Sequence, residues 1–173
     1  MRETNVALGA LGSRLIDYGL VFAATAGVQA ATSATIGVPS AEWFLEQSWL
    51  LSAWVMATMS LPMWIYNTAT VAGPQQATLG LRMVGLSVES SSGSSISIGT
   101  SLLRSAFMFL AWELANIAMF VPENFALSEP HPWQYIGLIA ANLYLITDIV
   151  VIIATGGRRS IADFVAGTRL VQP

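Results

Sequence analysis

Four long apolar runs constrain the fold of this chain more than any other feature. They cover approximately residues 13–34, 49–70, 101–121 and 133–155, and short polar segments separate them. A helix needs about 20 apolar residues to cross a bilayer, so each run is long enough. Only 10% of the 173 residues are charged, whereas soluble domains carry about 25%. The pattern predicts an all-α membrane protein, with one domain over residues 1–173 and four transmembrane helices.

The arginines predict the orientation of these helices. Every basic residue is an arginine, and all seven fall on one side: Arg2, Arg14, Arg82, Arg104, Arg158, Arg159 and Arg169. The connections on the other side, around residues 35–48 and 122–132, carry acids only: Glu42, Glu46, Glu123 and Glu129. The positive-inside rule then places both termini in the cytoplasm. A cleaved signal peptide would leave the same orientation, but Arg14 and Asp17 argue against it, because a signal's apolar region does not normally hold an ion pair.

Two segments predict small elements on the cytoplasmic side. In the connection at residues 73–100, apolar residues alternate from Leu79 to Val88, a serine-rich turn follows, and alternation resumes at Ile96 and Ile98. This pattern predicts a β-hairpin with a bulge in its first strand. Thr100 is the expected N-cap of the third helix.

The segment after the fourth helix predicts two more elements. Ser160 to Asp163 fit the capping box of a short C-terminal amphipathic helix, and Gly167 is placed to end it. Residues 168–171 are then expected to form a third short strand.

Three acids fall inside the predicted spans, where an ionisable group costs at least about 2.5 kcal/mol. The first is Asp17, which follows Arg14 by three residues on the same helix face. We expect the two to form a structural salt bridge at the helix entrance. The second is Glu113, near the middle of the third helix with Asn116 on its face. Desolvation favours its protonated form. It is either a neutral acid bonded across a helix interface or a proton- or cation-binding group.

The third acid is Asp148, in the inner half of the fourth helix and level with Asp17. The two carboxylates are expected to reach one cytoplasmic-side vestibule, which these arginines surround: Arg14, Arg104, Arg158 and Arg159. Such a cluster could bind a cation, relay a proton or neutralise itself, and the sequence leaves all three open.

Two further patterns concern helix packing. Gly19, Ala23 and Gly27 form a small-residue stripe that lets another helix approach closely. Pro62 is expected to kink the second helix.

Several kinds of chemistry are excluded by composition. The chain has neither cysteine nor lysine, and its only histidine, His131, lies between two prolines. Disulfides, thiolate ligands, Schiff bases and a histidine-rich zinc site are therefore ruled out. No nucleophile and base occur in a catalytic pattern, so we predict no enzyme activity, no cofactor, no metal site and no nucleic-acid partner.

Three segments carry a resemblance to a known family. They are Leu15-Ile16-Asp17, Thr78-Leu79-Gly80-Leu81-Arg82-Met83-Val84-Gly85-Leu86, and Arg158-Arg159-Ser160-Ile161-Ala162-Asp163 running into Ala166-Gly167-Thr168. In content and order they resemble the RDD family of small prokaryotic membrane proteins, named for one arginine and two aspartates. The resemblance implies that Asp17 and Asp163 are the two aspartates. Ala10 stands where the arginine usually is, which makes Arg14 a shifted substitute. Leu81 replaces a usual lysine, and Ala162 replaces the usual histidine.

The resemblance also implies a prokaryotic plasma-membrane location and a transport function, since some members are reported to exchange sodium for protons. Here Asp17, Glu113 and Asp148 would alternate between a proton and a monovalent cation, although Asp163 also has a plain role as the capping-box acid. Four helices are few for alternating access, so we expect a homo-oligomer in the lipid bilayer. The alternative is a non-transporting accessory subunit whose cytoplasmic arginines dock a membrane-protein partner or anionic lipid. The residues in question are Arg14, Asp17, Arg82, Arg104, Glu113, Asp148, Arg158, Arg159 and Asp163.

Overall fold

The computed structural model describes residues 3–35, 48–125 and 128–172, with the side chains of residues 3–5 and 32–33 left aside. Arg2, Glu42 and Glu46, on which part of the orientation argument rests, lie outside these ranges. Helix α1 (Glu3–Thr35) is longer than the predicted first span. Helix α8 (Pro132–Ala154) matches the predicted fourth span to within a residue at each end.

The second predicted span is one continuous helix with a wider, π-helical turn in its middle. It consists of α3 (Ser48–Val55), the π-helix η1 (Met56–Ser60) and α4 (Leu61–Ala72). Pro62 has no N–H to donate, and the preceding turn adapts: Leu61 donates its N–H to the carbonyl of Met56, five residues back. The proline expected to kink this span is thus accompanied by a π-helical turn.

The third predicted span is broken, which the apolar run at residues 101–121 did not indicate. Helix α6 (Ile98–Met108) and helix α7 (Leu110–Phe120) meet at a bend of 51°. Tyr144, on α8, donates its hydroxyl to the carbonyl of Phe107 (2.6 Å), which diverts an acceptor from the helical ladder at the break. Three helices in the described part of the chain are long and apolar enough to cross a membrane, and the bent pair would make a fourth span.

The small elements gather at one end of the long helices, which we call the sheet end. They are α5 (Leu79–Met83), β1 (Ser87–Ser90), α9 (Ile161–Ala166) and β2 (Thr168–Val171). Strands β1 and β2 pair antiparallel, with Val88 opposite Leu170. The C-terminal capping box, the left-handed Gly167 and the strand at 168–171 are confirmed.

The predicted hairpin within residues 79–98 is wrong. Residues 79–83 form α5 because Thr78 caps it, its side chain accepting the N–H of Leu81. The one remaining strand of this segment, β1, pairs with β2, 80 residues further along the chain at Glu89 and Arg169. The N-cap of α6 is Ser97, so the predicted cap Thr100 lies within the first turn of the helix, where its N–H donates to the hydroxyl of Ser97 and the two hydroxyls share a hydrogen bond.

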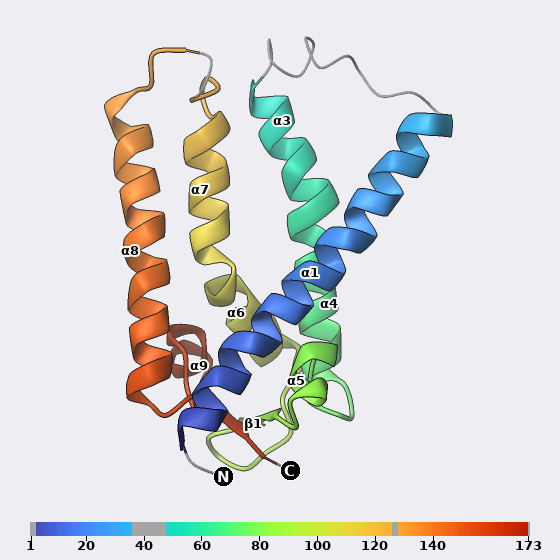
Figure 1. Cartoon of the computed structure of the whole chain (residues 1–173), viewed down its shortest axis with the longest axis vertical. Coiled ribbons are helices and arrows are strands. Elements are labelled where there is room, and N and C mark those ends of the chain that lie inside the picture. Colours follow the sequence, from blue (N-terminus) through green and yellow to red (C-terminus); the bar gives the residue numbers. More distant parts are fainter. Residues whose placement is uncertain (1–2, 36–47, 126–127, 173) are drawn as a thin grey trace.

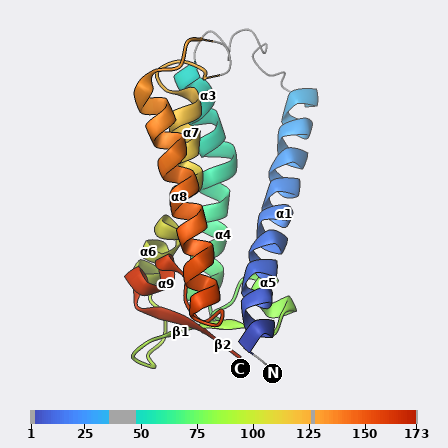
Figure 2. The same cartoon turned by 60° about the vertical axis from the view of Figure 1, so that its left-hand side comes forward.

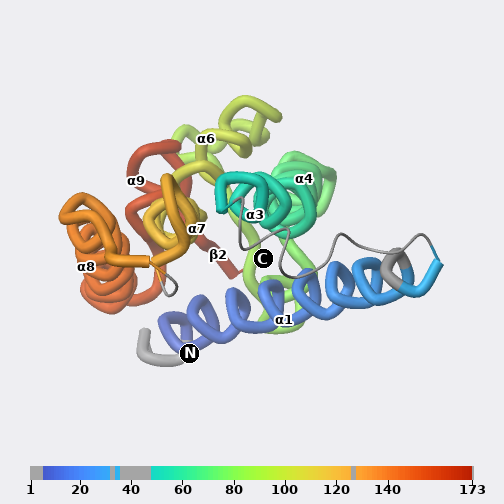
Figure 3. Tube along the Cα trace, turned by 90° about the horizontal axis from the view of Figure 1, so that it is seen from above, coloured from blue at the N-terminus to red at the C-terminus, as the bar shows by residue number. Residues whose placement is uncertain are grey.

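The long helices are arranged unevenly (Figures 1 and 2). The continuous helix formed by α3, η1 and α4 stands beside α7 and α8, whereas α1 crosses them obliquely and diverges toward its C-terminal end. Seen from above, α1 lies along one side of the other helices (Figure 3). Large apolar side chains are exposed along most of α1 and α8, as lipid-facing helices require. The larger cluster of buried apolar side chains lies at the sheet end, where α1, α4, α5, α8 and both strands meet: Ala10, Val71, Ala77, Leu81, Leu86, Val88, Ile96, Ile152 and Leu170. A smaller cluster consists of Met108, Phe109 and Ala162.

Candidate functional site

Three buried aspartates connect the elements of the sheet end: Asp17 on α1, Asp148 on α8 and Asp163 on α9. Each one accepts hydrogen bonds from at least two other segments, and their exposed fractions do not exceed 5%. A buried carboxylate is tolerated when its oxygens are paired in this way. Their partners decide whether each acid is available for chemistry.

Asp17 is held by neutral donors. It accepts the hydroxyl of Tyr66 (2.8 Å), the hydroxyl of Thr78 (2.6 Å) and the backbone N–H of Gly80 (2.8 Å). The contact with α5 is close enough that a Cβ on Gly80 would lie 2.3 Å from the carbonyl oxygen of Ser13. Asp17 therefore fastens α1 to α4 and to the start of α5.

Asp148 pairs with Arg14, and the predicted bridge between Arg14 and Asp17 is wrong. Nη1 of Arg14 lies 2.5 Å from Oδ2 of Asp148, and Oδ1 accepts the N–H of Ile161 at the start of α9. Arg14 reaches across to α8 because both oxygens of Asp17 already bind donors from α4 and α5. The pair thus links α1, α8 and α9.

Asp163 accepts the largest number of bonds among these three acids. Arg104 on α6 donates its Nε–H to Oδ1 (2.7 Å), where Thr168 also donates, while Ser160 donates both its N–H and its hydroxyl to Oδ2. Burial alone would raise the pKa of Asp163, but Arg104 and the hydroxyl donors lower it to about 2. Asp163 is therefore ionised at neutral pH and anchors α6, α9 and β2 to one another, in addition to its role as the capping-box acid.

The arrangement replaces the predicted shared vestibule with separate contacts. Asp17 and Asp148 bind different partners, and Arg104 is committed to Asp163. Arg159 donates to Ser91 and stacks on Phe164, and Arg82, at the surface, donates to Gln75. Arg158 is exposed and, with Arg159 and Arg169, lines a cavity of about 500 Å³ at the sheet end.

Glu113 differs from the aspartates. It lies in the first turn of α7, directly after the break, and both carboxyl oxygens are buried without a hydrogen-bond partner among the described residues. The indole N–H of Trp64 is likewise unpaired, and the two residues line one cavity of about 680 Å³. The sequence left two interpretations of Glu113: a neutral acid that bonds across a helix interface, or a proton- or cation-binding group. The bond that the first interpretation requires is absent from the contacts among the described residues. Asn116, one turn on, donates to the carbonyl of Ser52 instead.

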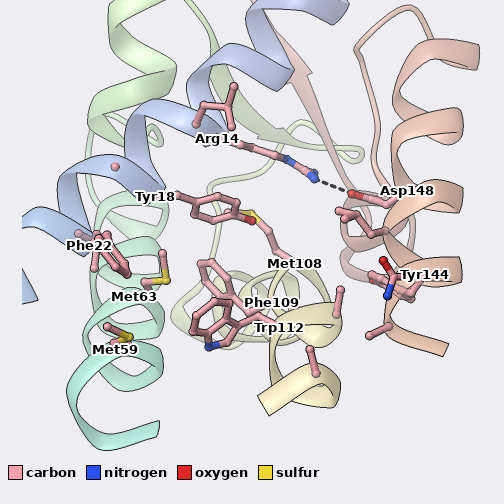
Figure 4. A pocket seen from close by; sticks show the side chains of 18 of the residues that line it. Arg14, Tyr18, Phe22, Met59, Met63, Met108, Phe109, Trp112, Tyr144 and Asp148 are labelled. Carbon is pink, nitrogen blue, oxygen red and sulfur yellow. Dashed lines mark hydrogen bonds and ion pairs between the residues drawn. The ribbon is translucent and has the colours of Figure 1, made fainter. Parts of the chain in front are cut away.

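A cavity of about 600 Å³ lies between α1 and α8, and we call it the α1–α8 cavity. Figure 4 shows Arg14 and Tyr18 extending into it from α1, with Asp148 and Tyr144 facing them from α8. Its other walls are apolar side chains of η1, α4, α6 and α7. This cavity reaches Ala111, Trp112 and Ala115 of α7 but not Glu113, which lines the cavity described above.

Sequence reasoning missed the two side chains that hold Asp17, namely Tyr66 and Thr78. Thr78 was recognisable as a helix N-cap, but the strand-like alternation after it obscured the signal. Tyr66 carries no local pattern that marks it as a partner of a residue 49 positions away.

Comparison with known proteins identifies the family. The family model described as "RDD family" matches residues 11–167, a range that includes all three aspartates. No curated protein and no solved structure matches the chain. RDD proteins are membrane proteins, in agreement with the apolar helices. The match covers most of the chain, which therefore belongs to the RDD family.

Proposed function

We propose that the chain is a four-span protein of a prokaryotic plasma membrane, with both termini in the cytoplasm. In this proposal the bent pair α6–α7 is the third span, and the sheet end faces the cytoplasm. Support comes from Arg14, Arg104 and Arg159, which take part in the contacts of the sheet end, and from Glu123, which lies near the opposite end of the helices. This charge distribution is what the positive-inside rule requires.

We further propose that the protein acts as a homo-oligomer in proton- or monovalent-cation-coupled transport, and that it is not an enzyme. The observation that carries this proposal is the carboxyl of Glu113, which has no hydrogen-bond partner among the residues that the structure describes. An ionised carboxylate without donors is costly in a low-dielectric interior, so a proton or a cation must accompany it. The other three acids have fixed partners, which leaves Glu113 as the coupling group.

The backbone around Glu113 supports this role. The break between α6 and α7 precedes Glu113, and three residues of η1, Met56, Ala57 and Ser60, line the same cavity. Ser60 also accepts the indole N–H of Trp112 (3.1 Å), so η1 contacts the first turn of α7, directly after the break. Interrupted helices and π-helical turns occur often at functional sites of membrane proteins.

The test uses purified protein in liposomes that enclose a pH-sensitive dye. After a pulse of sodium or potassium, we expect the wild-type protein to move protons and Glu113→Gln to lose most of this signal. Glu123→Gln is the matched control, because it makes the same chemical change at an exposed position. If neither cation moves protons through the wild-type protein, or if Glu113→Gln leaves the trace unchanged, the transport proposal fails.

The second candidate is an accessory subunit that docks an acidic partner, and the arginine-lined cavity at the sheet end favours it. Arg158, Arg159 and Arg169 surround about 500 Å³ beside the end of α8, where a basic pocket would meet lipid head groups. Arg158→Gln with Arg169→Gln should then weaken retention of phosphatidylglycerol during detergent extraction, whereas Arg82→Gln should not. This candidate would be excluded if all variants retain the same amount of lipid and the double variant co-purifies with the same proteins as the wild-type protein.

A further inference from the structure

The α1–α8 cavity has two chemically different parts. Most of its wall is apolar, with aromatic rings from Phe109 and Trp112 and flexible thioethers from Met59 and Met63. Its volume of about 600 Å³ falls within the range of about 300–1,000 Å³ usual for small-molecule sites. Methionine side chains adapt to irregular ligands and make favourable contacts with aromatic rings. An apolar ligand that carries a ring would fit this wall.

One end of the cavity is polar, and its charges cancel. Arg14 has five N–H donors, of which the contacts among the described residues use one, to Asp148. The phenol of Tyr18 lies beside this ion pair in Figure 4. The end therefore offers hydrogen-bond donors without a net charge, and it matches a neutral acceptor such as a carbonyl oxygen.

The depth of the polar end separates two kinds of ligand. Asp148 lies six residues before Ala154, the last residue of α8, which places it about 9 Å inside the end of that helix at 1.5 Å per residue. A phospholipid phosphate belongs at the interface and brings a negative charge, whereas Arg14 is already neutralised by Asp148 and Arg104 by Asp163. A neutral head group that resides below the interface fits both the depth of the polar end and its lack of net charge.

The length of the cavity requires a ligand with a tail. Along α1 its lining runs from Arg14 to Thr25, a distance of about 16 Å on a helix. Leu15, Phe22 and Leu145 are lining residues with exposed side chains, so the cavity communicates with the surface that faces lipid. A ligand dissolved in the bilayer could enter from there.

We propose that the α1–α8 cavity binds a membrane quinone. A ring carbonyl accepts hydrogen bonds from the remaining donors of Arg14, the ring lies against Phe109 and Trp112, and the isoprenoid tail follows α1 toward Thr25. The proposal concerns binding only. It is independent of the proposed transport function, because Glu113 does not line this cavity.

The experiment titrates a ubiquinone with a ten-carbon tail into the full-length protein in phosphatidylcholine nanodiscs and follows tryptophan fluorescence. Binding at one site gives saturable quenching, which Trp112→Phe should reduce, whereas dissolution in lipid gives quenching that rises without saturation. Gly19→Leu fills the cavity, since Gly19 lines it and a Cβ there meets nothing within 4 Å. Gly27→Leu is the matched control, because a Cβ at Gly27 is equally unobstructed and Gly27 lies outside the lining.

We expect Gly19→Leu to weaken quinone binding at least tenfold and Gly27→Leu to change it less than twofold. Added phosphatidylglycerol should not compete. Non-saturable quenching, equal affinities of the two glycine variants, or displacement of the quinone by phosphatidylglycerol would each overturn the proposal, the last in favour of a phospholipid site. Proton movement in liposomes is a separate readout, so loss of this proposal leaves the role of Glu113 unaffected.

Discussion

Arg14 and Asp148 stand 134 positions apart in the chain, yet Nη1 of the arginine lies 2.5 Å from Oδ2 of the aspartate. The contact joins α1 to α8 at the sheet end, before α1 diverges from the other helices (Figure 1). Together with the bonds of Asp17 to α4 and α5, it fixes the part of α1 that packs against the apolar cluster of the sheet end. The polar contacts of the sheet end thus compensate for the sparse packing of α1 further out.

Asp148→Asn should destabilise the protein strongly. Loss of one partner leaves the guanidinium of Arg14 buried without its counter-charge, which typically costs about 3–5 kcal/mol. The measurement is thermal unfolding in detergent. Glu89→Gln is the control, because it breaks the exposed pair with Arg169, a type of contact that contributes about 0–1 kcal/mol. Equal unfolding temperatures for the two variants would show that the buried pair does not anchor α1.

Gly80→Ala should disturb the contact between α1 and α5. The added methyl group would lie 2.3 Å from the carbonyl of Ser13 and 2.9 Å from the carboxyl of Asp17, so one of the two segments has to move. Overpacking of this kind costs about 1–3 kcal/mol or more. Gly99→Ala makes the same substitution in a helix where its nearest contact is 3.8 Å away, and it should not lower the unfolding temperature. A neutral effect of Gly80→Ala would contradict the close approach.

Asp163 should make the protein sensitive to acid in a defined pH window. The folded-state pKa of Asp163, about 2, lies below the unfolded value of 3.8. Its contribution to the free energy of unfolding is therefore complete above about pH 4 and is lost as the pH falls toward 2. A shift of this size corresponds to on the order of 2 kcal/mol. Denaturant titrations at several pH values measure it.

Two variants isolate this effect from that of other carboxyls. Asp163→Asn should show a shallower loss of stability between pH 4 and pH 2 than the wild-type protein. Should this variant not fold, Thr168→Val removes one donor to Oδ1 and should move the acid limb to higher pH. Identical acid limbs in wild-type and variant proteins would rule out Asp163 as the titrating group.

The predictable parts of this fold are those that local sequence determines. The spans in α1 and α8 follow from apolar length, and α9 with its ends follows from the capping box at Ser160 and from Gly167. The partner of Arg14 was not predictable in this way. A residue three positions away on the same helix, Asp17, fits the local rule, but the choice depends on donors from α4 and α5 that occupy Asp17 first.

The break at Phe109 and the pairing of β1 with β2 were missed for the same reason. The apolar run through residues 101–121 is continuous and gives no local sign of a break. What marks the position is the hydroxyl of Tyr144, from another helix, which donates to the carbonyl of Phe107. Similarly, the alternation of apolar residues in 79–88 is compatible with a hairpin. In the structure Thr78 caps α5 instead, and β1 pairs with the distant strand β2. In both cases a long-range contact selected one of two locally acceptable structures.

Tyr144→Phe should therefore change the bend between α6 and α7. Without the hydroxyl, the carbonyl of Phe107 returns to the helical ladder, and we expect about 1 kcal/mol lower stability and a straighter average path. The chain has no cysteine, so Leu103→Cys and Ile117→Cys, at exposed positions on α6 and α7, accept spin labels without background. The distance between the labels should lengthen and broaden in Tyr144→Phe. Tyr135→Phe, which removes the hydroxyl of an exposed tyrosine on the same helix, should leave the distance unchanged. An unaltered distance in Tyr144→Phe would mean that the break is set by packing at Phe109, whose side chain is buried against Tyr18.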